Sequence, residues 1–217
     1  MTSRRSGPTS ASSPQGQCGG WQRINADPLL ALLPGFLSPA LATTLQQRLE
    51  QEIPWTSPTI RLYGKAHRIP RSQCWMGDTD ARYRYSGRTL EPESWHPEID
   101  ALRPRIDEAL RAAGLPRDGF NSVLINRYDG GEQRMGWHSD DEPELGNDPI
   151  VASISLGSER PLRFREKDRR PGNAFNVWLP TGSLLLMGPG CQARWQHALA
   201  PRAIDGVRIN LTFRCVR

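Results

Sequence analysis

The sequence has few cysteines and lacks a long apolar run. Its 217 residues include four cysteines that lie far apart, with no CxxC pair and no Cys/His pairing at zinc-site spacing. This distribution is typical of reduced thiols and not of a disulfide framework. No stretch approaches the roughly 18 apolar residues of a membrane span, and the basic N-terminus lacks the apolar segment of a signal peptide. We therefore expect a soluble, cytoplasmic protein that does not associate with membranes.

Apolar residues are also scarce, at 37% of the chain with a mean hydropathy of −0.59. The first 26 residues are rich in Ser, Gly, Pro, Thr and Gln, and such a segment cannot bury enough apolar surface to offset the entropy lost on ordering. We predict a disordered polar tail over residues 1–26 and one folded domain over residues 27–217, acting as a monomer. The pI of about 9.4 favours an acidic partner such as nucleic acid.

Helical signals are confined to the N-terminal half. Ser38 is a suitable N-cap and Pro39 a suitable first-turn residue for a helix that runs to about Ile53. A second helix is predicted over residues 96–115, where apolar residues recur at helical spacing. Pro104 is expected to bend or interrupt this second helix.

After Gly119 the pattern changes to short β-rich runs with turn signals between them. The runs are SVLINRY, IVASISLG, RPLRFRE, AFNVWLP, GSLLLMG, ARWQHAL and RINLTFRCV. Seven short strands without intervening helices indicate an antiparallel sandwich or barrel, and a jelly roll is a natural form for that number. We predict a mainly β fold in which the two N-terminal helices brace one sheet.

The segment GWHSDDEPELGN places His138 two residues before Asp140 and adds further acids. On an extended segment these two side chains share a face, because strand side chains repeat every two residues. His197, in the run ARWQHAL, is a second candidate ligand. Two histidines and one carboxylate form the set that binds non-haem Fe(II) and leaves coordination positions open. The alternative is an acidic, solvated loop beside an incidental histidine.

The last predicted strand has one polar face. That face carries Arg208, Asn210, Thr212 and Arg214. Guanidinium groups match the two oxygens of a carboxylate, so this face suits a dicarboxylic co-substrate that chelates iron at its other end. The upstream strand adds Asn126 and Tyr128 on one face. The alternative is an ordinary strand with one face in water and the other in the core.

Several segments together resemble the AlkB family of Fe(II)/2-oxoglutarate dioxygenases. They are NRYDGG, WHSDDE, VASISLG, LRFR, GSLLLMG, WQHAL and RINLTFR, in the family's order and spacing. The upstream segments LYGKAHRIPR, WMGD and YRYSG resemble the nucleotide-recognition region of the animal DNA-repair members. The resemblance covers roughly residues 60–217, and the segment before it carries no such signal.

The resemblance implies a double-stranded β-helix (jelly-roll) core over about residues 121–217 and a nucleotide-recognition lid over about residues 60–120. It implies that the catalytic Fe(II) is bound by His138, Asp140 and His197. It implies that 2-oxoglutarate is bound by Asn126, Tyr128, Arg208, Asn210, Thr212 and Arg214. The third reactant is O₂.

The reaction that the resemblance implies is oxidative demethylation of N-alkylated bases in DNA, mainly 1-methyladenine and 3-methylcytosine. Hydroxylation of the N-methyl group gives a hemiaminal, which releases formaldehyde and the repaired base, while 2-oxoglutarate becomes succinate and CO₂. An RNA demethylase of the same chemistry is one alternative. A 2-oxoglutarate oxygenase of proteins or small molecules is another, and a basic module that only binds nucleic acid is a third.

The methylated bases are cationic, and the methyl group is hidden in a duplex, so the base must be flipped out or single-stranded. The candidate substrate-binding residues are Tyr63, Arg71, Tyr83, Tyr85, Asp141 and Glu142. The carboxylates suit the cation, the paired tyrosines suit stacking, the first tyrosine suits a wedge in the duplex, and the arginine suits a phosphate. The alternatives are a solvated acidic turn, core tyrosines and ordinary basic surface.

Two basic runs, one upstream from Arg61 to Arg71 and a second from Arg160 to Arg170 between two predicted strands, suit a groove that follows a nucleic-acid backbone. Within the second run, Arg163 and Arg165 alternate with Phe164 and therefore share a face. We expect Trp178 to lie in the core and Trp137 to pack around the iron site.

Overall fold

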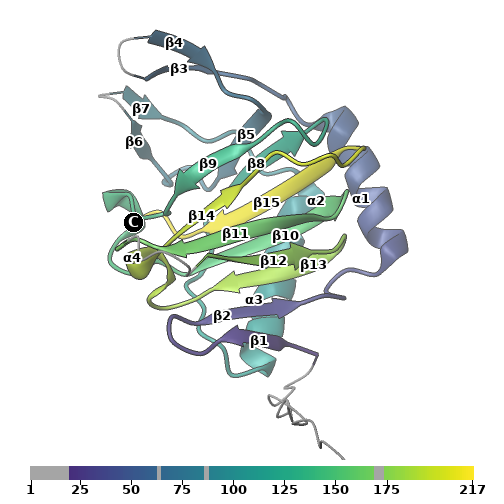
Figure 1. Cartoon of the computed structure of the whole chain (residues 1–217), viewed down its shortest axis with the longest axis vertical. Coiled ribbons are helices and arrows are strands. Elements are labelled where there is room, and N and C mark those ends of the chain that lie inside the picture. Colours follow the sequence, from purple (N-terminus) through teal and green to yellow (C-terminus); the bar gives the residue numbers. More distant parts are fainter. Residues whose placement is uncertain (1–19, 63–64, 86–87, 169–173) are drawn as a thin grey trace, which may run out of the picture.

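The computed structural model describes residues 20–62, 65–85, 88–168 and 174–217. Two antiparallel sheets pack against each other, and helices cover the outer side of the larger one (Figure 1). The seven-stranded sheet, which we call the major sheet, has the order β1 (Gln22–Asn25), β2 (Leu30–Leu33), β13 (Ser183–Met187), β10 (Val151–Gly157), β15 (Arg208–Arg214), β8 (Ser122–Tyr128) and β5 (Ser72–Gly77). The four-stranded sheet, which we call the minor sheet, has the order β12 (Phe175–Leu179), β11 (Arg160–Glu166), β14 (Trp195–Leu199) and β9 (Met135–His138).

Four strands of each sheet form the predicted jelly roll. All seven predicted strands are present, as β8 and β10 to β15, and β9 completes the set of eight. Two hairpins lie at one end of the sandwich (Figure 1): β3 (Thr59–Leu62) with β4 (Lys65–Arg68), and β6 (Tyr83–Tyr85) with β7 (Arg88–Leu90). The predicted nucleotide-recognition region therefore consists of short β-hairpins and β5, followed by the second predicted helix.

The major sheet is covered on both sides, which explains its apolar central strands. All five residues of β13 are buried, as are all residues of β10 except Gly157. Ile154 and Leu184 belong to the same apolar cluster as Leu45 of α1 (Pro39–Glu52) and Ile106 of α3 (Leu102–Ala112). The alternate residues of these strands pack toward the minor sheet, where Leu185 joins a second cluster. Strands enclosed in this way are nearly continuous apolar runs.

The two predicted helices form where their end signals lie. The Ser38 hydroxyl accepts a hydrogen bond from the Leu41 amide at 3.3 Å and caps α1. The second helix is interrupted as predicted: α2 (Pro97–Asp100) ends just before Ala101, and α3 follows. Pro104 accounts for the interruption, because its ring would clash with the carbonyl of the residue four positions earlier in a continuous helix. Two short elements complete the chain, α4 (Cys191–Arg194) and the 3₁₀ helix η1 (Pro143–Leu145).

The predicted boundary of the polar tail at residue 26 is wrong. Trp21 is only 5% exposed and joins the main apolar cluster, and β1 pairs with β2 in antiparallel register. A buried indole contributes enough apolar area to order a short polar strand, which the composition of the segment does not reveal. Residues 1–19 lie outside the described residues. None of the helices in the described ranges is both long and apolar enough to cross a membrane.

Replacing Trp21 with Ala is expected to lower the free energy of unfolding by about 3–5 kcal/mol, because it leaves a cavity in the main core. The exposed neighbour Gln22 provides the control, since its replacement by Ala is expected to change stability by no more than about 0.5 kcal/mol. Urea denaturation measures both variants. Equal stabilities of the two variants would show that this segment contributes nothing to the folded state.

Candidate active site

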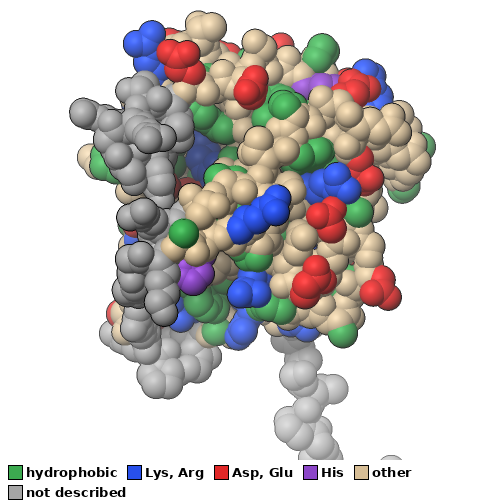
Figure 2. Space-filling view, turned by 90° about the horizontal axis from the view of Figure 1, so that it is seen from above, with side chains coloured by type: hydrophobic (Ala, Val, Ile, Leu, Met, Phe, Trp, Pro, Cys, Tyr) green, Lys and Arg blue, Asp and Glu red, His purple; other side chains and the backbone are tan. Residues whose placement is uncertain are grey.

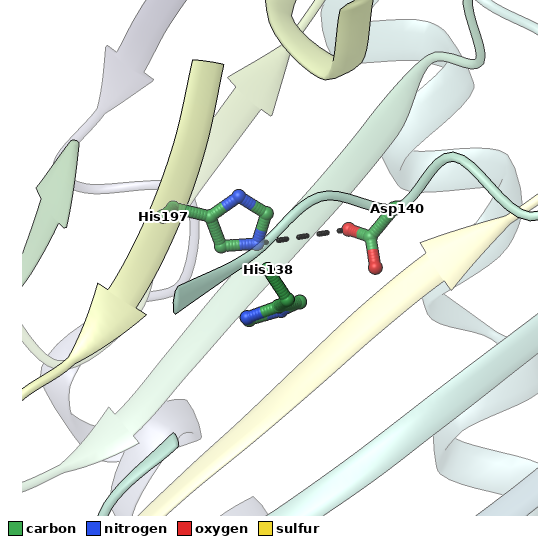
Figure 3. A group of neighbouring side chains, drawn as sticks. All are labelled: His138, Asp140 and His197. Atoms are coloured by element: carbon green, nitrogen blue, oxygen red, sulfur yellow. Dashed lines mark ion pairs between the residues drawn. The ribbon is translucent and has the colours of Figure 1, made fainter. Parts of the chain in front are cut away.

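Three predicted metal ligands meet at one end of the minor sheet. His138 ends β9 and lies directly opposite His197 of the neighbouring strand β14. Asp140 follows two residues after β9, and its carboxylate turns back toward the two imidazoles (Figure 3). One potential ligand atom from each residue lies within 4.8 Å of the others, and His197 Nε2 is 3.8 Å from Asp140 Oδ2. The predicted convergence of these distant segments is confirmed.

A β-bulge aims His138 into the sandwich. Met135 lies opposite Leu199 and His138 opposite His197, so β9 advances three residues where β14 advances two. The extra residue in the bulged strand re-aims the side chains beside it, and both Met135 and His138 line the same cavity. Nδ1 of His138 lies 2.8 Å from the Gly136 carbonyl. A carbonyl only accepts, so Nδ1 donates this hydrogen bond and Nε2 is the ring nitrogen left for a metal.

Asp140 is ionised and has one free oxygen. Its Oδ1 accepts a 2.6 Å hydrogen bond from Nη2 of Arg214, whereas the buried Oδ2 has no hydrogen-bond partner. Burial alone would raise the pKa of Asp140, but the Arg214 guanidinium outweighs burial and holds the pKa at about 2. A buried anionic oxygen without a partner normally carries a large energetic penalty. A metal cation bound by this oxygen would remove the penalty.

The second histidine is electrically neutral. Burial, reinforced by His138, lowers the pKa of His197 to about 3. Neutral imidazole is the form that ligates metals. The neutral His197, the His138 imidazole and one carboxylate oxygen therefore suit Fe(II), and this set leaves three positions for other ligands.

A partly enclosed cavity between the two sheets adjoins the three residues. Besides the two histidines, its polar lining consists of Asn126, Tyr128, Ser153, Arg208, Asn210, Thr212 and Arg214. Its apolar lining consists of Met135, Leu162, Leu179, Met187 and Leu199. The structure thus brings together all six residues predicted to bind the co-substrate and adds Ser153, which the sequence analysis missed. The sequence of β10 does not show which of its residues face the cavity, because both faces of the strand are buried.

Arg208 presents an uncompensated charge to this cavity. It is 3% exposed, its Nη2 donates to the Ser155 hydroxyl at 3.0 Å, and its buried Nε has no partner. Burial lowers its pKa to about 10, so it remains a cation at neutral pH. Within the described ranges no carboxylate forms an ion pair with it. An anionic ligand would satisfy this group.

The polar side chains between the two arginines are held in place. Asn210 donates to the Ser153 hydroxyl at 2.7 Å and to the Ile154 carbonyl at 3.0 Å. Its Oδ1 accepts from the Thr212 hydroxyl at 2.9 Å. Such fixed groups provide a preorganised polar wall between Arg208 and Arg214.

The predicted substrate-binding residues have different outcomes. Arg71 is partly buried beside the cavity, where its Nε donates to Asn126 Oδ1 at 2.8 Å. Asp141 is exposed and forms a 2.8 Å ion pair with Lys167, and partly buried Glu142 precedes η1. The side chains of Tyr83 and Tyr85 in β6, and the whole of Tyr63, lie outside the described residues.

Parts of both basic runs lie outside the described residues, namely Arg169, Arg170 and the side chains of Arg61 and Lys65. On the face seen in Figure 2, Lys and Arg side chains lie among Asp and Glu side chains. Arg160, counted in the second basic run, is 1% exposed and points inward. Its phase in β11 could have shown this, since Leu162 and Phe164 alternate with the outward arginines.

Arg160 instead donates hydrogen bonds to two loops, one after β8 and one after β14, at the end of the cavity. Its Nη2 donates to the carbonyls of Gln133 at 2.9 Å and Ala200 at 2.8 Å, and more weakly to Gly131 at 3.3 Å. Its guanidinium carbon lies 5.5 Å from the centroid of the Tyr128 ring. Arg160 therefore positions Tyr128 from behind, while Arg208 approaches the same ring at 5.7 Å.

Gln192 is a further buried residue that the sequence analysis missed. It is 1% exposed, and its Oε1 accepts the Asp140 amide at 2.9 Å. The neighbouring Ser139 hydroxyl donates to the Trp195 carbonyl at 2.9 Å. These two bonds fix the backbone on which the carboxylate ligand depends.

Comparison with known proteins first defines the class. Residues 29–214 match the family model of the 2OG-Fe(II) oxygenase superfamily. Two solved structures share the fold: OsALKBH1, with a TM-score of 0.66 at 18% identity over 89% of this chain and 99% of that one, and a 2OG-Fe(II) oxygenase family oxidoreductase from Burkholderia pseudomallei, with a TM-score of 0.56 at 16% identity over 85% and 84%.

Curated relatives then define the branch. The mouse protein named DNA oxidative demethylase ALKBH2 is 34% identical over 95% of this chain and 88% of its own length. The human alpha-ketoglutarate-dependent dioxygenase alkB homolog 3 is 36% identical over 86% of this chain and 66% of its own. This chain belongs to the AlkB family of 2OG-Fe(II) oxygenases. It is a dioxygenase whose family uses Fe(II) and 2-oxoglutarate, and the predicted jelly-roll fold is confirmed.

Replacing Arg160 with Met is expected to destabilise the protein by about 2–4 kcal/mol, because several buried carbonyls lose their donor. The matched control is Arg163→Met on the same strand, where the side chain points outward and the expected cost is below about 1 kcal/mol. Chemical denaturation of both variants measures the difference. Similar costs for the two would refute the role assigned to the buried guanidinium.

Proposed function

We propose that this protein oxidatively demethylates N-alkylated bases in DNA, 1-methyladenine and 3-methylcytosine in particular. The single observation that supports this most directly is the pairing of a His–Asp–His set with a cavity that presents a buried, uncompensated arginine. The relatives named DNA oxidative demethylase support the choice of substrate. The reaction reverses alkylation damage directly.

The three converged residues have defined roles in this proposal. Fe(II) would be held by His138, His197 and the free Oδ2 of Asp140, and when bound it would supply the redox chemistry by which O₂ and 2-oxoglutarate hydroxylate a C–H bond. Arg214 holds the other carboxylate oxygen at 2.6 Å. The carboxylate is thus restricted to one ligating oxygen, which keeps further coordination positions available.

The second carboxylate of 2-oxoglutarate is assigned to Arg208. The guanidinium is buried, has an unpartnered Nε and forms no ion pair within the described residues. Burial raises the pKa of Tyr128, so its phenol stays protonated and can donate to the same carboxylate. Asn126, Asn210 and Thr212 line the path between this end and the metal end.

Hydroxylation of the N-methyl carbon gives a hemiaminal, which collapses to formaldehyde and the unmodified base. Oxygen from O₂ enters the methyl group and succinate, and CO₂ leaves from 2-oxoglutarate. The apolar side chains of the cavity, among them Leu162 and Leu199, limit access of water to the reacting groups.

Recognition of the base is assigned to the loop after Asp140 and to the β6–β7 hairpin. Asp141 and Glu142 adjoin the metal ligands, so their charge lies where a cationic base must enter. Because Asp141 is paired with Lys167, a cationic base would replace the lysine ammonium as its partner. Tyr83 and Tyr85 are proposed to stack on the flipped base, and Tyr63 to fill the gap that it leaves.

The reaction itself can be tested on oligonucleotides that contain 1-methyladenine or 3-methylcytosine. With Fe(II), ascorbate and 2-oxoglutarate, the protein is expected to remove the mass of one methylene from the DNA and release an equal amount of formaldehyde. His197→Ala is expected to abolish this loss because the metal set is incomplete. The control is Thr44→Ala, an exposed residue of α1 outside the nucleotide-recognition region, which is expected to retain turnover.

Single-stranded, duplex and RNA versions of the same sequence identify the polymer. Loss of methyl groups only from RNA would keep the oxygenase and overturn DNA as the substrate. Succinate formation without loss from any nucleic acid would point to a protein or small molecule instead.

Replacing Arg208 with Met is expected to raise the KM for 2-oxoglutarate about 30-fold or more, because the carboxylate loses a buried charged partner. Arg163→Met, which removes an outward-facing arginine, is expected to leave this KM unchanged. Succinate formed over a range of 2-oxoglutarate concentrations measures both. An unchanged KM in the Arg208 variant would assign the carboxylate to another residue.

A further inference from the structure

The minor sheet has an outer face that none of the described helices covers. Its strands lie at the front of the sandwich in Figure 1, with the major sheet and its helices behind them. Period-two alternation directs one set of side chains away from the cavity. We call this set the outer face; it comprises Trp137, Arg163, Arg165, Asn176, Trp178 and Gln196.

Trp178 does not lie in the core, contrary to the prediction. It is 48% exposed, and among the described residues the only other exposed large apolar side chain is Leu41, at 40%. Val177 and Leu179 take the inward positions of β12, so Trp178 must point outward. An exposed indole on a sheet face offers a flat surface on which a ligand ring can stack.

Each outer-face tryptophan is accompanied by arginine. The Arg202 guanidinium carbon lies 5.5 Å from the centroid of the Trp178 ring. At the other edge of the sheet, Arg165 lies 4.2 Å and Arg163 5.7 Å from the centroid of Trp137. Trp137 therefore packs against these arginines on the outside of the sheet. The prediction that it packs around the iron site is wrong.

The arginine beside Trp137 is fixed in position. Both Nε and Nη2 of Arg165 donate to Gln196 Oε1, at 3.1 and 2.8 Å. No acidic residue occupies an outward position on these four strands. The outer face therefore combines positive charge with two aromatic rings, which suits a polyanion whose units have flat apolar rings.

We propose that the outer face binds the single-stranded nucleic acid that flanks the target base. Phosphates contact the arginines, and bases stack on Trp137 and Trp178. This inference rests on the proposed function, because it extends the substrate beyond the cavity. Cation–aromatic and stacking contacts of this kind tolerate any base sequence, as an enzyme that acts on damage at arbitrary positions requires.

The position of the outer face supports this path. Trp137 directly precedes His138 in β9, so a strand that leaves the cavity over β9 meets Trp137 first. The sheet order then leads across β14 and β11 to Trp178 on β12. Three steps between adjacent strands span roughly 14 Å, which corresponds to about four nucleotides at a stacked spacing of about 3.4 Å.

Binding of an unmethylated 15-nucleotide single strand, followed by fluorescence anisotropy, tests the outer face without any need for catalysis. Trp178→Ala is expected to weaken binding about fivefold or more, the usual effect of removing one stacking ring, and Trp178→Phe is expected to restore most of it. Leu41→Ala, the other exposed large apolar residue but on α1, is the matched control and is expected to bind as the native protein does.

Salt dependence and substrate length provide two further readouts. Arg202→Gln is expected to reduce the slope of log Kd against log salt concentration by about 0.7, the effect of losing one phosphate contact to a single strand. In demethylation, Trp178→Ala is expected to raise the KM of a methylated 15-mer about fivefold or more while leaving the KM of a methylated trinucleotide and both kcat values unchanged.

Unchanged binding of the 15-mer by Trp178→Ala would overturn the proposal and leave the face to a protein partner. An equal rise in KM for the trinucleotide and the 15-mer would also overturn it, because the effect would then arise at the cavity. If the native protein binds the strand through Trp178 but demethylates neither substrate, the proposed reaction fails and the outer face stands.

Discussion

The ion pair between Asp140 and Arg214 is the interaction on which the site depends. Asp140 follows a strand of the minor sheet and Arg214 ends β15 of the major sheet, so the pair joins the two layers beside the metal ligands. Without the guanidinium, burial would favour the protonated acid, and the donor set would lose its only anion. The same bond occupies Oδ1 and leaves Oδ2 free. The contact with Arg214 therefore determines both the charge of Asp140 and the oxygen that is left to ligate a metal.

The cavity is rich in positive charge in a region with little access to water. Arg208 and Arg160 both approach Tyr128, and Arg71 reaches Asn126, which lies two residues before Tyr128 in β8. Buried charges without counter-ions are costly, so this end of the sandwich is stabilised by any small anion that fits. A dicarboxylate that binds here therefore also stabilises the folded state, because it neutralises the buried arginines.

Sequence reasoning succeeded where one strand's own alternation decides the outcome. The polar face of β15 and the pairing of His138 with Asp140 could be predicted because residue type and period-two spacing are local properties. The bulge that aims His138, the inward phase of Ser153 and the exposure of Trp178 depend on neighbouring strands and on which sheet edge is covered. The tail boundary failed for a similar reason, since Trp21 is ordered by contacts with a core formed much later in the chain.

The N-terminal strand also determines where the major sheet ends. β2, with the sequence LALL, lies beside the wholly buried strand β13, and β1, with the sequence QRIN, covers the outer side of β2. An apolar edge strand is a template for pairing with other chains, whereas a short polar one with a charge discourages it. Gln22 and Arg23 are exposed on that last strand. These few N-terminal residues therefore protect the enzyme against edge-to-edge aggregation, a matter of solubility and not of catalysis.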